Sequence, residues 1–123
     1  MSKKIFLDTF YKQFFDFLNE LDKMYPNDSD FSTFSTKLSV LKIVNPMLPI
    51  QFIKTEIIEK YQEQIFKKDE SFFVNSKDIE QTSEINIFFK LKSYITDMTE
   101  ENKEIVWAYI HIIVKLTMKI LEF

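Results

Sequence analysis

The chain has no Cys, no Gly and no Arg, and it has only one His. Each absence excludes a class of site. Without Cys there is no disulfide, no thiol nucleophile and no Cys-based zinc site. Without Gly, the loops that bring backbone close to a phosphate or a dinucleotide are excluded. Without Arg there is no planar fork to clamp a phosphate or a carboxylate.

What is present describes an ordinary globular chain. It has 123 residues, of which 46% are apolar and 28% charged, and a net charge of −3. This length and composition predict a single folded domain over residues 1–123. Its 16 Lys and 19 acidic residues alternate along the chain, so we expect no nucleic-acid partner. Abundant Lys, Phe and Ile, with little Gly, Ala or Pro, also fit an AT-rich genome.

The start of the chain does not have the pattern of a secretion signal. Lys3, Lys4 and Asp8 interrupt what would have to be an apolar stretch. The lack of Cys fits a reducing compartment. Together these features predict a cytoplasmic protein.

Apolar residues recur at helical spacing in five segments. The first helix is expected over residues 4–25, the second from 31 to no later than 45, and the third over 50–65. A less regular stretch, in which Phe72 and Phe73 form a short turn, precedes a fourth helix over 83–96 and a fifth over 100–121. Ser29 or Asp30 can cap the second helix, and Thr99 the fifth. The expected fold is therefore all-α, a compact bundle of about five helices.

The last of these helices is apolar around most of its circumference. Such a helix is normally buried among its neighbours, so we expect it at the centre of the bundle. The alternative is that one of its stripes is partly exposed and binds a partner or a second copy of the chain. Its apolar run is too short for a membrane span. The candidate interface is that stripe, with one further anchor on the first helix: Trp107, Val114, Met118, Leu121 and Phe15.

Reactive residues do not converge in the sequence. His111 is expected on a solvated ribbon, with Glu104 as the only weak candidate partner, so we expect no catalytic residues. Asp28 and Asp30 lie in a polar turn that lacks the Gly and the closing Glu of a calcium loop, which makes helix capping the better interpretation. We expect no metal site and no cofactor.

Four segments together resemble a known group of proteins. They are FLNELDKMYPNDSDF (Phe17–Phe31), LKIVNPMLPIQFIKTEI (Leu41–Ile57), KDESFF (Lys68–Phe73) and TEENKEIVWAYIHIIVKL (Thr99–Leu116). Their order and spacing resemble uncharacterised small helical proteins of the large nucleocytoplasmic DNA viruses of algae and amoebae. The resemblance implies a viral origin, and a place in the host cytoplasm or the virion. It implies no activity and no catalytic residues.

The sequence thus favours a function exerted through surfaces. The main hypothesis is a non-enzymatic protein-interaction or structural module that uses the apolar stripe of the C-terminal helix. The partner would be another protein or a second copy of the chain. The alternative hypothesis is a binder of an apolar ligand or an amphipathic partner helix, held in a Phe-lined groove.

Overall fold

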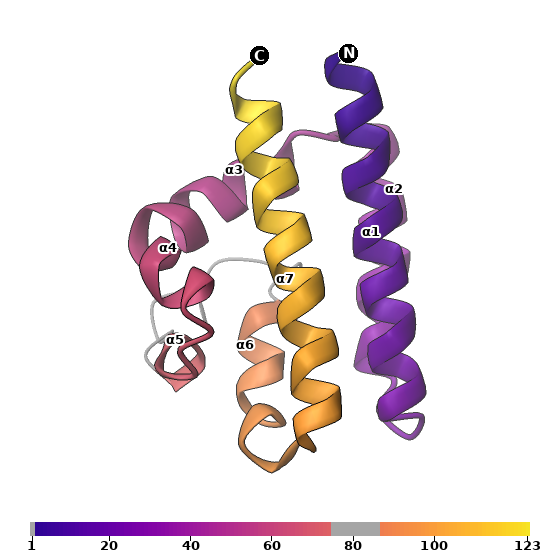
Figure 1. Cartoon of the computed structure of the whole chain (residues 1–123). Helices are drawn as coiled ribbons and strands as arrows, with labels where there is room; N and C mark the ends of the chain where they lie inside the picture. Colours follow the sequence, from indigo (N-terminus) through magenta and orange to yellow (C-terminus); the bar gives the residue numbers. More distant parts are fainter. Residues whose placement is uncertain (1, 75–86) are drawn as a thin grey trace.

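The computed structural model describes residues 2–74 and 87–123 of the chain. Over these ranges the chain is helical and contains no strand, which confirms the predicted all-α class. Figure 1 shows the helices packed side by side, with both ends of the chain at the same end of the bundle. The elements in chain order are α1 (Lys3–Met24), α2 (Asp30–Val44), α3 (Leu48–Phe52), the π-helical η1 (Ile53–Ile58), α4 (Glu59–Phe66), α5 (Ser71–Val74), α6 (Ile87–Lys92), the 3₁₀ turn η3 (Ile95–Asp97) and α7 (Glu100–Leu121).

The first two helices form an antiparallel pair. The Ser2 side chain caps α1 by accepting a hydrogen bond from the backbone N–H of Ile5. The buried face of α1 is Phe10, Tyr11, Phe14, Phe17, Leu18 and Leu21. At the far end of α2, the Tyr11 hydroxyl donates to the Pro46 carbonyl over 2.8 Å. This bond fixes the place where the chain leaves α2, and α2 lies behind α1 in Figure 1.

The third predicted helix exists, but it is not a regular α-helix. The chain is helical from Leu48 to Phe66, and its middle, η1, has the wider i→i+5 hydrogen bonds of a π-helix. Ile53 and Ile57 in η1 are both buried. A π turn rotates the residues that follow it about the helix axis. The prediction assumed 3.6 residues per turn throughout, so it could not reveal the π turn.

The fourth predicted helix ends earlier than expected. The α-helix α6 ends at Lys92, and the prediction that it extends to residue 96 is wrong. The Ser93 hydroxyl donates to the Lys90 carbonyl over 2.8 Å, a local bond that competes with the helical pattern. The predicted start at Ser83 and the apolar residue Ile85 lie outside the described residues. The short turn predicted at Phe72 and Phe73 is α5, where both rings are fully buried.

The C-terminal helix lies at the centre of the bundle, as predicted. Figure 1 shows α7 running between α1 on one side and α3 and α4 on the other. Thr99 caps it, because its hydroxyl accepts from the backbone N–H of Asn102 over 3.1 Å. Its buried residues are Val106, Trp107, Ile110, Ile113, Val114, Thr117 and Ile120.

Candidate functional site

The apolar stripe predicted on the C-terminal helix is not an open surface. Trp107 is 3% exposed and Val114 is fully buried, so the expectation that they form a contact surface is corrected. The indole of Trp107 packs against the ring of Phe73, with 5.3 Å between the ring centroids. Met118 and Leu121 are partly buried and also pack against the core. The cover over Trp107 comes from α5, a distant segment, and periodicity within one helix cannot predict it.

The additional anchor proposed on α1 also packs inward. Phe15 is partly buried against the core, with its ring 6.3 Å from that of Tyr11. The structure therefore does not join Phe15 and the α7 stripe into one exposed surface.

His111 is half-buried, where the sequence predicted a solvated side chain. Its Nε2 lies 2.7 Å from the Ile65 carbonyl oxygen and donates to it. The ring also packs near those of Phe66 and Trp107, at 5.6 Å and 6.1 Å. His111 therefore joins α7 to the end of α4. Its weak candidate partner Glu104 instead faces Lys68, at 3.5 Å.

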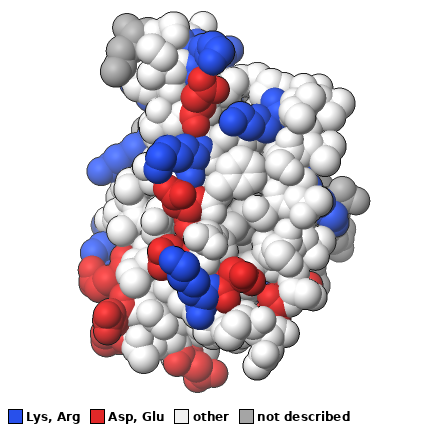
Figure 2. Space-filling view, turned by 90° about the vertical axis from the view of Figure 1, so that its right-hand side faces the viewer, with Lys and Arg blue, Asp and Glu red and all other residues white. Residues whose placement is uncertain are grey.

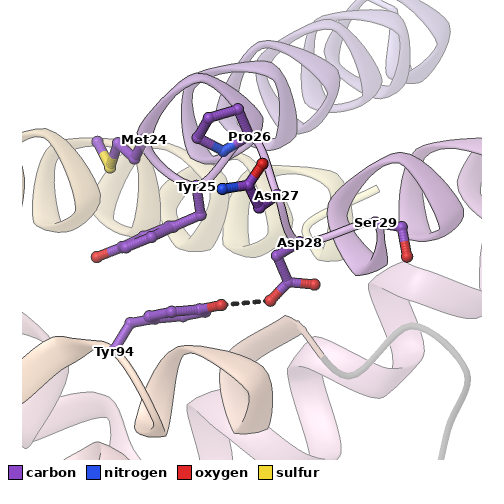
Figure 3. A pocket seen from close by; sticks show the side chains of 7 residues that line it. All are labelled: Met24, Tyr25, Pro26, Asn27, Asp28, Ser29 and Tyr94. Carbon is purple, nitrogen blue, oxygen red and sulfur yellow. Dashed lines mark hydrogen bonds between the residues drawn. The ribbon is translucent and has the colours of Figure 1, made fainter.

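A polar cluster connects the α1–α2 turn to α6. Lys90 of α6 lies 2.8 Å from carboxylate oxygens of both Asp28 and Asp30. The Tyr94 hydroxyl donates to Asp28, and Figure 3 shows this bond beside the stacked rings of Tyr25 and Tyr94. The two ring centroids are 3.9 Å apart. An open hollow of about 480 Å³ lies between the turn and Tyr94.

The hydrogen bonds in this cluster move its pKa values away from neutrality. The pKa of Asp28 falls to about 2, chiefly because Lys90 donates to it and then because Tyr94 and the backbone N–H of Asp30 do. The two carboxylates raise the pKa of Lys90 above its usual 10.5, Asp28 more than Asp30. The bond to Asp28 also raises the pKa of Tyr94. A general acid or base works best with a pKa near the operating pH, whereas the pKa values of Asp28, Lys90 and Tyr94 are shifted away from neutral pH.

The cluster therefore acts as a structural clasp. Asp28 accepts from the backbone N–H of Asp30 at the start of α2, over 2.9 Å, so this turn does cap the helix, but the prediction that Ser29 or Asp30 supplies the capping oxygen is wrong. The residue at the N-cap position, Ser29, makes no side-chain cap bond, so the capping oxygen comes from one residue earlier. Between them, Asp28 and Lys90 hold α6 against the α1–α2 turn.

The hollow lined by Phe side chains is small. Phe14, Leu18, Phe34, Leu38 and Ile87 surround a volume of about 10 Å³. This is far below the ~300 Å³ or more that a small-molecule site usually offers. A second surface hollow of about 320 Å³ lies between α1 and α2. Most of its lining is polar, namely Asn19, Asp22, Ser32, Ser35 and Thr36, and the apolar residues Leu18 and Phe31 complete it.

The clearest exposed apolar surface lies at the C-terminal end of α2. Its four residues, which we call the α2 patch, are Val40, Ile43, Val44 and Leu48, exposed by 54%, 85%, 72% and 43%. In Figure 2, α2 lies on the right-hand side. The upper half of that side is white apart from blue lysine side chains, and no red acidic side chain is visible there. Charges of both signs alternate in a column to its left. This contrast matches α1, where Lys4 pairs with Asp8 and Lys12 with Asp16, each at 2.8 Å.

The α2 patch was not predicted from the sequence. The regular apolar stripe of α2 is Phe31, Phe34, Leu38 and Leu41, of which Phe31 and Leu38 are buried. Val40, Ile43 and Val44 lie off that stripe. The sequence did contain a sign of this patch, namely the apolar residues on a second face of the helix. Such a helix is either buried on both faces or has one apolar face exposed.

Searches for other kinds of site and for relatives give negative findings. In residues 2–74 and 87–123, no three His, Asp or Glu side chains gather as a metal site would require. Over the same ranges, no helix combines the length and the hydropathy needed to cross a membrane. No family model, no curated protein and no solved structure matches the chain.

Proposed function

We propose that the protein is a non-enzymatic interaction module that binds another protein through the α2 patch. The observation that carries this proposal is the exposure of four aliphatic side chains within a nine-residue span, Val40–Leu48. Exposed apolar residues scattered singly are normal, whereas a contiguous cluster marks a contact surface. The proposal keeps the function expected from the sequence and moves its surface from α7 to α2.

The state of the reactive side chains supports a function without catalysis. His111 is bound to the Ile65 carbonyl, and Asp28 to Lys90 and Tyr94. Lys103 of α7 lies 3.1 Å from Glu70, which raises the pKa of that Lys. Each of these groups has a partner from another segment of the chain. These contacts within the fold account for the positions of the side chains, and no role in substrate binding is needed to explain them.

The viral origin and the host-cytoplasmic or virion location are part of the same proposal. They are supported by the resemblance of four sequence segments alone. The alternative hypothesis, a binder of apolar ligands among Phe-lined helices, has no comparable observation in its favour, because the described Phe-lined hollow holds about 10 Å³.

Affinity capture from cells that express the chain naturally tests the proposal. The test bait carries Ile43→Gln and Val44→Gln, and the control bait carries Ile5→Gln and Ile112→Gln. The control residues are also exposed, by 50% and 40%, but lie on α1 and α7. Glutamine suits a helix and adds no charge. Circular dichroism melts must first show that both variants fold as the wild type does.

We expect the wild type and the control to recover a shared partner that the test bait loses. The purified partner should then bind the wild type at least ~10-fold more tightly than the test variant, a difference of about 1.4 kcal/mol. If the test bait and the wild type recover the same partners with equal affinity, the α2 patch is not the interface. Substrate turnover by the purified chain would overturn the non-enzymatic function.

A further inference from the structure

The outer face of α2 has the spacing at which two helices pack. Thr33, Thr36, Val40 and Ile43 follow one another at intervals of three, four and three residues, and all four are exposed. We call them the α2 seam. Alternating steps of three and four place side chains on one line along a helix, which is the geometry of coiled-coil contacts. All four residues are β-branched, so their side chains hold few rotamers and lose little entropy when covered.

Among the described residues, the seam lies on the outer side of α2, whose inner side packs against α1. The helix α2 has 15 residues, and its inner residues Phe31 and Leu38 are buried. At 1.5 Å per residue it is about 22 Å long, enough for two heptads of contact. The shape of the surface therefore suits a partner helix laid along it, with the α2 patch at one end.

Lysines are the only charged residues of α2 after Asp30, and Asp22 of α1 lines the same hollow as the seam residue Thr36. From Phe31 to Thr55 the chain has no Asp and no Glu, and it has Lys37, Lys42 and Lys54. Lys37 directly follows the seam residue Thr36, at the flanking position where coiled coils choose their partners by charge. Lys42 lies closer to α1, with its Nζ 5.9 Å from the centre of the Tyr11 ring. On α1, the pKa of Asp8 is lowered chiefly by its hydrogen bond from Lys4, at 2.8 Å, and also by the charge of Lys42.

This charge pattern argues against a second copy of the chain as the partner. Two α2 helices packed on their seams would bring Lys37 of each copy to the interface, and the one acid of α2, Asp30, already pairs with Lys90 at 2.8 Å. Like charges across such an interface disfavour it, whereas opposite charges favour it. An anionic membrane would attract the lysines too, but each basic residue near such a surface contributes only about 1 kcal/mol. Two of them and a few aliphatic side chains make a weak anchor.

We propose that the α2 seam binds an amphipathic helix of a partner protein whose apolar stripe is flanked by Asp or Glu. This inference rests on the proposed function and specifies the chemistry of the partner. The apolar stripe of the partner helix covers Val40 and Ile43. Its acidic residues pair with Lys37, and they also exclude partners with basic flanks.

A selection from a peptide library tests the inference without knowledge of the natural partner. The library displays helical peptides of three heptads, with small or large aliphatic residues at the two core positions. The two flanking positions are randomised among Glu, Lys and Gln. Peptides that bind the full chain are collected, and those that also bind the Ile43→Gln and Val44→Gln variant are removed. We expect Glu to be enriched at the flanking positions and Lys to be depleted.

A charge swap then checks the pairing. The best Glu-flanked peptide and its Lys-flanked version are measured by fluorescence anisotropy against the wild type and Lys37→Glu. We expect the wild type to prefer the Glu-flanked peptide by ~10-fold or more, about 1.4 kcal/mol, and Lys37→Glu to lose or reverse that preference. The matched control Lys115→Glu changes an exposed lysine of α7 and should leave the preference intact.

Several outcomes would overturn the inference, and they differ from failure of the proposed function. Equal enrichment of Lys and Glu, or no enriched peptide, contradicts an acidic partner helix. If sedimentation shows a dimer that Ile43→Gln and Val44→Gln disrupt, the patch binds a second copy instead. If vesicles with 30% phosphatidylserine bind the wild type but not that variant, the patch is a membrane contact. A natural partner that depends on the patch but docks no acidic helix would uphold the interaction and refute this inference alone.

Discussion

Asp28 shows how one carboxylate can hold three segments together. It accepts from Lys90 of α6, from the Tyr94 hydroxyl and from the backbone N–H that begins α2. Its side chain is only 15% exposed, so these bonds are partly shielded from water. Hydrogen bonds to a charged group contribute more than those between neutral groups. We therefore regard Asp28 as the residue on which the α1–α2 turn most depends.

Replacement of Asp28 by Asn tests this role. We expect the free energy of unfolding at neutral pH to fall by about 1–2 kcal/mol, measured by urea denaturation, because a charge-assisted pair with Lys90 is lost. The control Asp22→Asn should change it by less than about 0.5 kcal/mol. A variant as stable as the wild type would show that the clasp does not stabilise the fold.

The same carboxylate predicts a dependence on pH. Its folded pKa, about 2, lies below the ordinary 3.8, so its contribution is present above the ordinary value. As the pH falls from 3.8 toward 2, the unfolded state takes up the proton first and the contribution is lost. The stability difference between the wild type and Asp28→Asn should therefore shrink over that interval. A difference that stays constant from pH 7 to pH 2 would contradict the lowered pKa.

At the scale of whole elements, α7 and α2 differ in how much of their apolar surface is covered. The helix α7 is apolar on several faces, and α1, α3, η1, α4 and α5 pack against it. The helix α2 also has apolar residues on a second face, but it exposes Ile43 by 85% and Val44 by 72%. The total apolar content of a helix therefore did not indicate which helix has an uncovered face. The arrangement of its neighbours did.

The burial of Trp107 can be measured directly. We expect its fluorescence to be blue-shifted and weakly quenched by acrylamide in the native chain, and Trp107→Ala to lower the free energy of unfolding by about 3–5 kcal/mol. The control Ile112→Ala, on the exposed side of the same helix, should cost less than about 1 kcal/mol. If acrylamide readily quenches the indole and Trp107→Ala changes the free energy of unfolding only slightly, the stripe on α7 is exposed, as the sequence first predicted.

At the scale of the molecule, one hydrophobic cluster connects the helices. It extends from Phe10 of α1 to Ile120 of α7, and it includes Phe72 of α5 and Phe88 of α6. The rings of Phe72 and Phe88 are 6.0 Å apart, although the residues lie on either side of segment 75–86. A shared core of this kind makes the unfolding of separate parts costly.

We therefore expect the chain to unfold in a single transition. Far-UV circular dichroism reports on the helices, and Trp107 fluorescence reports on the core beside α5. The two signals should give the same midpoint in urea, within the error of the measurement. A fluorescence change that precedes the loss of helix would show that α5 and the indole detach independently, which would contradict one cooperative core.

The boundaries of the long helices could be predicted because their signals are local. Thr99 begins α7 with a side-chain bond three residues away, and Pro26 lies just beyond the end of α1. The predicted bounds of α1, α2 and α7 differ from the observed ones by only a residue or so. The π-helical η1 was missed because a pattern at 3.6 residues per turn does not reveal a π turn, and the early end of α6 because the local bond from Ser93 to the Lys90 carbonyl was not anticipated.

The candidate surface could not be predicted in the same way. The exposure of Ile43 depends on which of the described segments pack against α2, and the burial of Trp107 on the presence of α5. The half-buried His111 depends on the Ile65 carbonyl, which is 46 residues away in the chain. The spacing of residues within one helix cannot predict such contacts between distant segments.

By itself, the sequence determined the helical class, the position of the long helices and the exclusion of chemistry that needs Cys, Gly or Arg. These follow from properties of single residues and from contacts three or four positions apart. Only the tertiary structure decided which apolar face is covered, because coverage requires a second segment and residues distant in sequence supply it. The α2 patch, and with it the proposed partner, follows from that tertiary arrangement.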